Sequence, residues 1–149
     1  MKKISIILLS IVAFVSTASA TIIFDHDRRI DYSALPAEAQ HFVSSYFAEE
    51  RVSFVELDEG IISNEYKVVF ESGLKLEFDG AGNWTEVDCR HEAVPQAIIP
   101  AAIADYVKSS YPNAKVVEIK RERHEWEVKL SSGLELTFDK SYRLIDVDD

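Results

Sequence analysis

Two segments of the chain carry apolar residues at helical spacing, and each segment opens with a proline. The first follows Leu35-Pro36 and the second follows Ile99-Pro100, 64 residues later. The apolar positions are Ala39, Phe42, Val43, Tyr46 and Phe47 in the first segment, and Ile103, Tyr106, Val107 and Tyr111 in the second. Proline suits the first turn of a helix, where its missing N–H has no intrahelical partner. The pattern therefore predicts two amphipathic helices, the second of which ends before Pro112.

Four segments with strand character follow each predicted helix. The opening strands are 52–57 and 116–119, and the final strands are 84–88 and 144–148. Between them, apolar residues alternate with polar ones and the two copies match: Tyr66, Val68 and Phe70 with Trp126, Val128 and Leu130, then Leu74, Leu76 and Phe78 with Leu134, Leu136 and Phe138. Ser72-Gly73 and Ser132-Gly133 supply matching hairpin turns. Alternation with period two predicts a sheet with one buried face and one polar face.

The chain is thus an internal repeat of the α+β class, with a helix and four antiparallel strands in each unit. Because one unit alone cannot bury its helix and its sheet, we expect the two units to share one sheet, with both helices on one face. Repeat 1 spans residues 35–88, the connection 89–98 and repeat 2 residues 99–149, in a single domain of residues 35–149. Repeat 1 has four extra residues, which fall in the loop 58–64.

The N-terminal segment has the features of a secretory signal. Lys2 and Lys3 precede the apolar run 4–15, and the small residues 18–20 follow. Cleavage after Ala20 leaves residues 21–34 as a lead-in, whose charged part, 25–29, we expect to be mobile. The apolar run is too short to span a bilayer and the only cysteine is far from the cleavage site, so the sequence predicts a soluble periplasmic protein without a membrane anchor.

The charge of the chain narrows the class of partner. The formal net charge is −10, and it becomes −12 when Lys2 and Lys3 are removed. An acidic chain without clustered Lys and Arg disfavours nucleic acid and anionic lipid as partners. The same charge favours cationic proteins or peptides.

No convergent catalytic or metal-binding set stands out in the sequence. Cys89 and His91 are two residues apart and can face one side of an extended segment, but no third member is evident, so a structural or surface role is favoured over catalysis. The segment 79–83 has oxygen ligands at alternate positions, yet the twelfth position of an EF-hand would be Arg90. The acidic end 146–149 is interpreted as a solvated strand end that places Leu144 and Asp146 on one side. We predict no catalytic residue, no metal site and no cofactor.

The doubled motif that runs from Glu65-Tyr66-Lys67-Val68 through Ser72–Asp79, with its counterpart from Glu125 to Asp139, resembles the PepSY-like, β-lactamase-inhibitor-like family of secreted bacterial proteins. The resemblance covers residues 30–148. It implies a tandem α+β fold in which a continuous antiparallel sheet lies beside two helices, in a periplasm. It implies no known reaction, and this chain lacks the disulfides of the secreted β-lactamase inhibitor.

Two groups of residues are candidate partner contacts. Ile61 and Ile62 in the inserted loop can anchor a partner if they are exposed, although folding over the end of the core is the favoured interpretation. The second group lies on the polar face of the sheet: Lys67, Lys75, Glu77, Glu127, Lys129, Glu135 and Thr137. The leading hypothesis is a non-enzymatic module that binds or inhibits another exported protein or a peptide. The alternative is a periplasmic sensor of a small ligand or cation.

Overall fold

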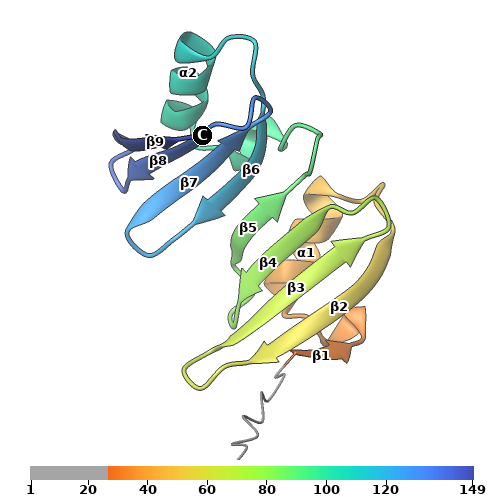
Figure 1. Cartoon of the computed structure of the whole chain (residues 1–149). Coiled ribbons are helices and arrows are strands. Elements are labelled where there is room, and N and C mark those ends of the chain that lie inside the picture. Colours follow the sequence, from red (N-terminus) through yellow and green to blue (C-terminus); the bar gives the residue numbers. More distant parts are fainter. Residues whose placement is uncertain (1–26) are drawn as a thin grey trace, which may run out of the picture.

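The strands form one antiparallel sheet in which each strand pairs with its neighbours along the chain, in the order β1 to β9. The computed structural model describes residues 27–149 (Figure 1). The strands are β1 (Asp27–Ile30), β2 (Val52–Glu59), β3 (Asn64–Phe70), β4 (Lys75–Asp79), β5 (Trp84–Asp88), β6 (Val116–Arg121), β7 (Glu125–Leu130), β8 (Glu135–Asp139) and β9 (Leu144–Asp148). The helices are α1 (Ala37–Tyr46) and α2 (Ala101–Ser110), with the short 3₁₀ turns η1 (Tyr32–Ala34) and η2 (Gln96–Ile98).

The predicted α+β class and the two helix-plus-four-strand units are confirmed. Strands β2 to β5 belong to the first unit and β6 to β9 to the second, and β5 pairs with β6 to join them. The signal segment and its cleavage after Ala20 lie outside the described residues. In the part of the chain that the structure describes, no helix has the length and apolar character needed to span a membrane.

The lead-in before repeat 1 contains a strand that we did not predict. β1 pairs with β2, so that Arg29 lies opposite Glu56 and Ile30 opposite Val55. The expectation of a mobile segment is therefore wrong for residues 27–29. The segment was missed because three of its four residues are charged, which leaves Ile30 as its single apolar position and no alternation to read.

One row of directly opposed apolar residues crosses all nine strands on the face that the helices cover. The row is Ile30, Val55, Val68, Leu76, Val87, Ile119, Val128, Leu136 and Val147. The helices pack on this face in the same way in both units. The ring of Phe42 from α1 meets Phe78 edge-on at 5.7 Å, and that of Tyr106 from α2 meets Phe138 edge-on at 5.5 Å. At the joint between the units, the rings of Trp84 and Trp126 lie 6.0 Å apart.

A β-bulge in the last strand changes which of its side chains point toward the helices. The register of β8 with β9 shifts between Thr137 and Phe138, so Leu144 lies opposite Phe138 and Asp146 opposite Thr137. Paired residues point to the same side of a sheet, so Leu144 faces the helices and Asp146 faces away from them. The prediction that these two residues share a side is wrong, because Ile145 is an extra residue in the strand.

The inserted loop of repeat 1 extends the hairpin of β2 and β3 instead of folding over the core. Pairing continues to Glu59 opposite Asn64, which leaves only residues 60–63 as the turn. Gly60 is required there, because a Cβ atom at this position would lie 2.3 Å from the carbonyl oxygen of Ser63. Ile61 and Ile62 are fully exposed, at 103% and 99%. The favoured expectation that they cap the core is wrong, since the continued pairing carries them past its end.

Candidate binding surface

The face of the sheet that points away from the helices carries most of the charge of the strands, and we call it the outer face. Within the described residues no helix packs on it (Figure 1). Its central row of opposed residues is Arg29, Glu56, Lys67, Glu77, Glu86, Lys120, Glu127, Thr137 and Asp146. A second row, which starts at Phe54 and Val69, continues through Lys75, Asp88, Glu118, Lys129, Glu135 and Asp148.

Carboxylates outnumber cations on the outer face. The strands place fifteen acidic residues there: Asp27, Glu56, Asp58, Glu65, Glu77, Asp79, Glu86, Asp88, Glu118, Glu125, Glu127, Glu135, Asp139, Asp146 and Asp148. They place five basic residues there: Arg29, Lys67, Lys75, Lys120 and Lys129. The other described residues are nearly balanced, with ten acidic and nine basic side chains. The negative charge of the chain is therefore concentrated on one surface.

The strand pattern correctly placed its candidate contacts on this face. Lys67 and Glu77 lie opposite each other with 3.7 Å between the ammonium and carboxylate groups, and Glu127, Lys129 and Glu135 follow on β7 and β8. The acidic and basic residues of β5 and β6 were missed, Glu86 and Lys120 among them. The alternation of polar and apolar residues in 84–88 and 116–121 indicates that these side chains point to the polar face. It does not indicate that they meet, because β5 and β6 belong to different repeats.

Carboxylates crowd the centre of the outer face, where Glu77 lies directly opposite Glu86. Burial, and then the neighbouring charge of Glu77, raise the pKa of Glu86 above its ordinary value. Lys120 lies 3.7 Å from Glu86 and 3.3 Å from Glu118. Burial opposes its charge, but these carboxylates outweigh burial and raise the pKa of Lys120. The ammonium group of Lys120 thus pairs with two carboxylates, so the centre of the outer face keeps an excess of negative charge.

Two surface hollows open on the outer face. One of about 110 Å³ lies over β1 to β4 and is lined by Asp27, Glu56, Asp58, Glu65 and Glu77, with Lys67 beside them. The other, of about 510 Å³, lies near the joint, and its lining includes the charged groups Asp88, Arg90, Glu118 and Lys129, together with His91. Among residues 27–149, no three His, Cys, Asp or Glu side chains converge as metal ligands.

Cys89 and His91 do not form a pair. Cys89 is 5% exposed and packs in the apolar core, whereas His91 is exposed and lines the larger hollow. The expectation that they can share a side is wrong, because the left-handed conformation of Arg90 turns the chain between them. Burial, and then the charge of Asp88, raise the pKa of the Cys89 thiol to about 11. The thiol is therefore protonated at neutral pH and is a poor nucleophile.

This burial predicts that Cys89 does not react with thiol reagents in the folded protein. We expect modification by an aromatic disulfide reagent at pH 8 to be at least about a hundredfold slower in buffer than in denaturant. Absorbance of the released thiolate measures both rates. Similar rates in the two conditions would contradict the buried position of the sulfur.

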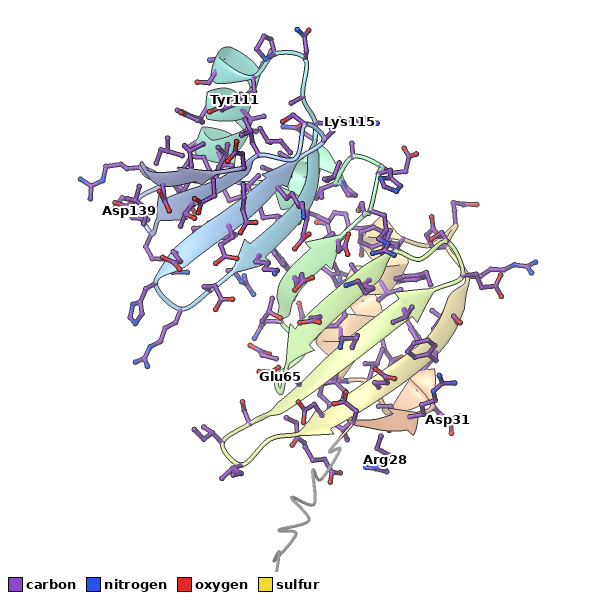
Figure 2. The ribbon with its side chains drawn as sticks, in the orientation of Figure 1. Arg28, Asp31, Glu65, Tyr111, Lys115 and Asp139 are labelled. Carbon is purple, nitrogen blue, oxygen red and sulfur yellow. The ribbon has the colours of Figure 1, made fainter. Side chains whose placement is uncertain are left out.

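The side chains of Asp79 and Asp139 are occupied by their own turns, which explains the oxygen-rich pattern of 79–83. The Oδ1 atom of Asp79 accepts hydrogen bonds of 2.9 Å from the backbone N–H groups of Ala81 and Asn83. Asp139, which is labelled in Figure 2, accepts equivalent bonds in the second unit from the backbone N–H groups of Ser141 and Arg143. Burial acts to raise the pKa of Asp79, but the bonds from its turn outweigh it and lower that pKa. These residues close hairpins.

Comparisons with known proteins agree with this architecture. A family model described as "Putative beta-lactamase-inhibitor-like, PepSY-like" matches residues 64–146. A solved structure, described as a putative periplasmic protein of the DUF2874 family from Bacteroides vulgatus, is 42% identical, with a TM-score of 0.82 over 85% of this chain and 99% of that chain. A second structure, described as a putative calcium-regulated periplasmic protein from Bacteroides thetaiotaomicron, is 45% identical, with a TM-score of 0.81 over 84% and 98%. A third, described as a putative periplasmic protein of unknown function from Bacteroides vulgatus, is 32% identical, with a TM-score of 0.79 over 83% and 99%. No curated protein matches the chain.

Proposed function

The chain belongs to the PepSY-like family, as its doubled sequence pattern indicated, and on this basis we propose that it is a non-enzymatic periplasmic module that binds another exported protein or a peptide. The partner lies against the outer face of the sheet and is basic where it makes contact. Periplasmic location is supported by the names of the three similar structures. Neither those names nor the family description indicates an enzymatic activity.

The concentration of charge on the outer face carries this proposal. Fifteen carboxylates against five cations on one surface create a negative potential that attracts a basic partner and orients it during encounter. The face is broad, and its charged groups stand in rows set by the sheet register. Such a platform suits a protein segment better than a small molecule, because the two hollows on it are open to solvent and lined by several charged side chains.

The tip of the β2–β3 hairpin provides an apolar contact beside the charged face. Ile61 and Ile62 are exposed, and Asp58 and Glu65 lie opposite each other on the outer face near the base of the tip. Two adjacent exposed isoleucines are costly to leave in water, and contact with a partner would remove about 2 kcal/mol of that cost for each. We therefore assign the tip the role of an apolar anchor for a partner held mainly by charge.

A basic peptide that cannot form a strand tests the outer face without involving the sheet edges. The probe is a decapeptide of repeating Lys-Lys-Pro, since proline prevents a continuous strand ladder. The test variant carries Glu77→Gln, Glu86→Gln and Glu127→Gln on the outer face. Its matched control carries Glu38→Gln, Glu92→Gln and Asp105→Asn, three exposed acids that belong to no strand of the sheet. Both variants change the net charge equally.

We expect the outer-face variant to bind the probe about tenfold more weakly than the parent, and the control about twofold more weakly. Titration calorimetry at low salt measures both affinities, and added salt weakens binding by the parent. The affinity for the probe also falls as the pH is lowered from neutral, because protonation removes the carboxylate charges. The fall begins above the ordinary pKa range of glutamate, since the pKa values of Glu86 and Glu127 are raised. Equal losses in the two variants would overturn the proposal, since total charge and not the outer face would then decide binding.

Cation sensing is a second candidate function, favoured by the calcium-regulated description of the structure that is 45% identical. The small hollow lined by Asp27, Glu56, Asp58 and Glu65 is the candidate region, and since these carboxylates do not converge as the structure stands, a bound cation would have to draw them together. A ligand that binds only the folded state raises the melting temperature. A rise with about 5 mM calcium, absent with equal magnesium and lost in Asp58→Asn, would support this function. An unchanged melting temperature would exclude it.

A further inference from the structure

The last strand has a free edge where its counterpart in the first repeat is paired. β5 lies between β4 and β6, whereas β9, which occupies the same place in repeat 2, pairs only with β8 among the described residues. The consequence is visible in the apolar row. Val87 is fully buried, while its counterpart Val147 is 43% exposed. The first repeat therefore shows what a neighbour of β9 would cover.

The pairing of β5 with β6 also supplies the geometry of such a neighbour. Ile119 lies opposite Val87 and Lys120 opposite Glu86, and the backbone N–H of Cys89 donates to the carbonyl of Val117 at 2.9 Å. Along an edge strand, the backbone N–H and C=O groups of every second residue point away from the neighbouring strand. In β9 the groups of Val147 are among those that point away from β8. An unpaired row of this kind is a template for strand addition.

Charges at the free edge indicate what chemistry the added strand would have. In the first repeat, Lys75 lies opposite Asp88 and its ammonium group is 3.2 Å from that carboxylate. In the second repeat, Glu135 lies opposite Asp148, so two carboxylates face each other. Like charges directly opposed on a sheet are destabilising, and a cation from an added strand would relieve them. Asp146, the counterpart of Glu86, has no Lys120 beside it.

We propose that the free edge of β9 binds an extended basic segment of another exported protein by antiparallel strand addition. An apolar residue of the segment lies opposite Val147, and lysine or arginine lies opposite Asp146 and Asp148. The site extends the proposed function with a second surface, and it stands whether or not the outer face binds a partner.

A second copy of the chain fits this edge less well than a basic segment. Its own free edge strand is β1, and Ile30 is the apolar residue that would lie opposite Val147. In antiparallel register, Arg29 would then lie opposite Asp148 and Asp31 opposite Asp146. A second copy thus supplies a cation at one of these two positions and a carboxylate at the other, whereas a basic segment supplies a cation at both.

The test uses peptides with the sequence of residues 114–122, blocked at both ends, because this segment contains β6. We expect the peptide with Glu118→Lys to bind more tightly than the unchanged peptide, and the peptide with Lys120→Glu to bind at least about tenfold more weakly. In the protein, Val147→Pro removes the outward N–H and lowers the affinity for the unchanged peptide at least about tenfold. Val147→Thr retains this N–H and keeps that affinity within about threefold of the parent. Thermal melting confirms that both variants fold.

Amide hydrogen exchange locates the bound peptide. We expect exchange at Val147 to slow on binding, and we expect the variant with Glu77→Gln, Glu86→Gln and Glu127→Gln to bind this peptide within about threefold of the parent. That result separates the edge from the outer face. Absence of saturable binding up to about 1 mM, or equal affinity of the Val147→Pro variant, would overturn the proposal. Dimerisation that Val147→Pro abolishes, without peptide binding, would assign the edge to a second copy instead.

Discussion

Replacement of Phe78 with alanine is expected to lower the free energy of unfolding by about 3–5 kcal/mol, which is a large share of the stability of a domain of this size. The side chain is fully buried beneath α1. Its ring meets Phe42 edge-on, and it lies opposite Tyr66 on β3 and Trp84 on β5. Alanine removes these contacts and leaves a cavity that the surrounding strands cannot close. Urea unfolding, followed by tryptophan fluorescence and by circular dichroism, measures the loss.

Phe54→Ala is the matched control, because this phenylalanine lies on the outer face, where its ring packs under the guanidinium of Arg29 at 4.3 Å. We expect a loss of no more than about 1.5 kcal/mol there. Phe138→Ala in the second repeat should cost as much as Phe78→Ala, and both should unfold in one transition, since the apolar row is continuous. Equal losses for Phe54 and Phe78, or two separate transitions, would contradict a single core on the helix-covered face.

The second large effect concerns the joint between the repeats. Val87→Lys is expected to lower the free energy of unfolding by about 4 kcal/mol or more, because it places an ammonium group in the buried row between Leu76 and Ile119. Val147→Lys, the same substitution at the corresponding position of repeat 2, is expected to change stability by less than about 0.5 kcal/mol. The partial exposure of Val147 allows the lysine to reach water.

Thermal and urea unfolding of the two lysine variants test this contrast directly. A Val87→Lys protein that keeps the stability of the parent would show that β5 and β6 do not form a buried joint. Severe destabilisation by Val147→Lys would show that the edge of β9 is already covered, which would also remove the basis for strand addition there.

Much of the fold was readable from local patterns. The alternation at Tyr66, Val68 and Phe70 and the proline-led stripes identified the strands, the helices and their repetition, because burial of one face imposes these periods on the sequence. The bulge at Ile145 could not be predicted from the sequence. An extra residue in a strand changes which side chains point to each face of the sheet, but it leaves the composition of the strand unchanged. β1 was missed for a different reason: its backbone pairing with β2 holds it in place, and its side chains carry little apolar signal.

The candidate surface was predicted in part for similar physical reasons. Glu77 and Glu127 were recognised because they alternate with apolar residues inside their own hairpins. Glu86 and Lys120 meet only through the joint between repeats, and a pairing between distant segments leaves no short-range signal. The exposure of Ile61 and Ile62 was misjudged because composition does not show how far a hairpin continues to pair.

The central claim is that a basic partner lies on the outer face of the sheet, and nuclear magnetic resonance of the isotopically labelled protein tests it most directly. The Lys-Lys-Pro decapeptide is titrated while amide and side-chain signals are followed. We predict that the largest shifts come from Glu77, Glu86, Lys120 and Glu127 and from their strand neighbours, while residues of α1 and α2 stay unchanged. Shifts centred on the helices, or none at saturating peptide, would contradict the account.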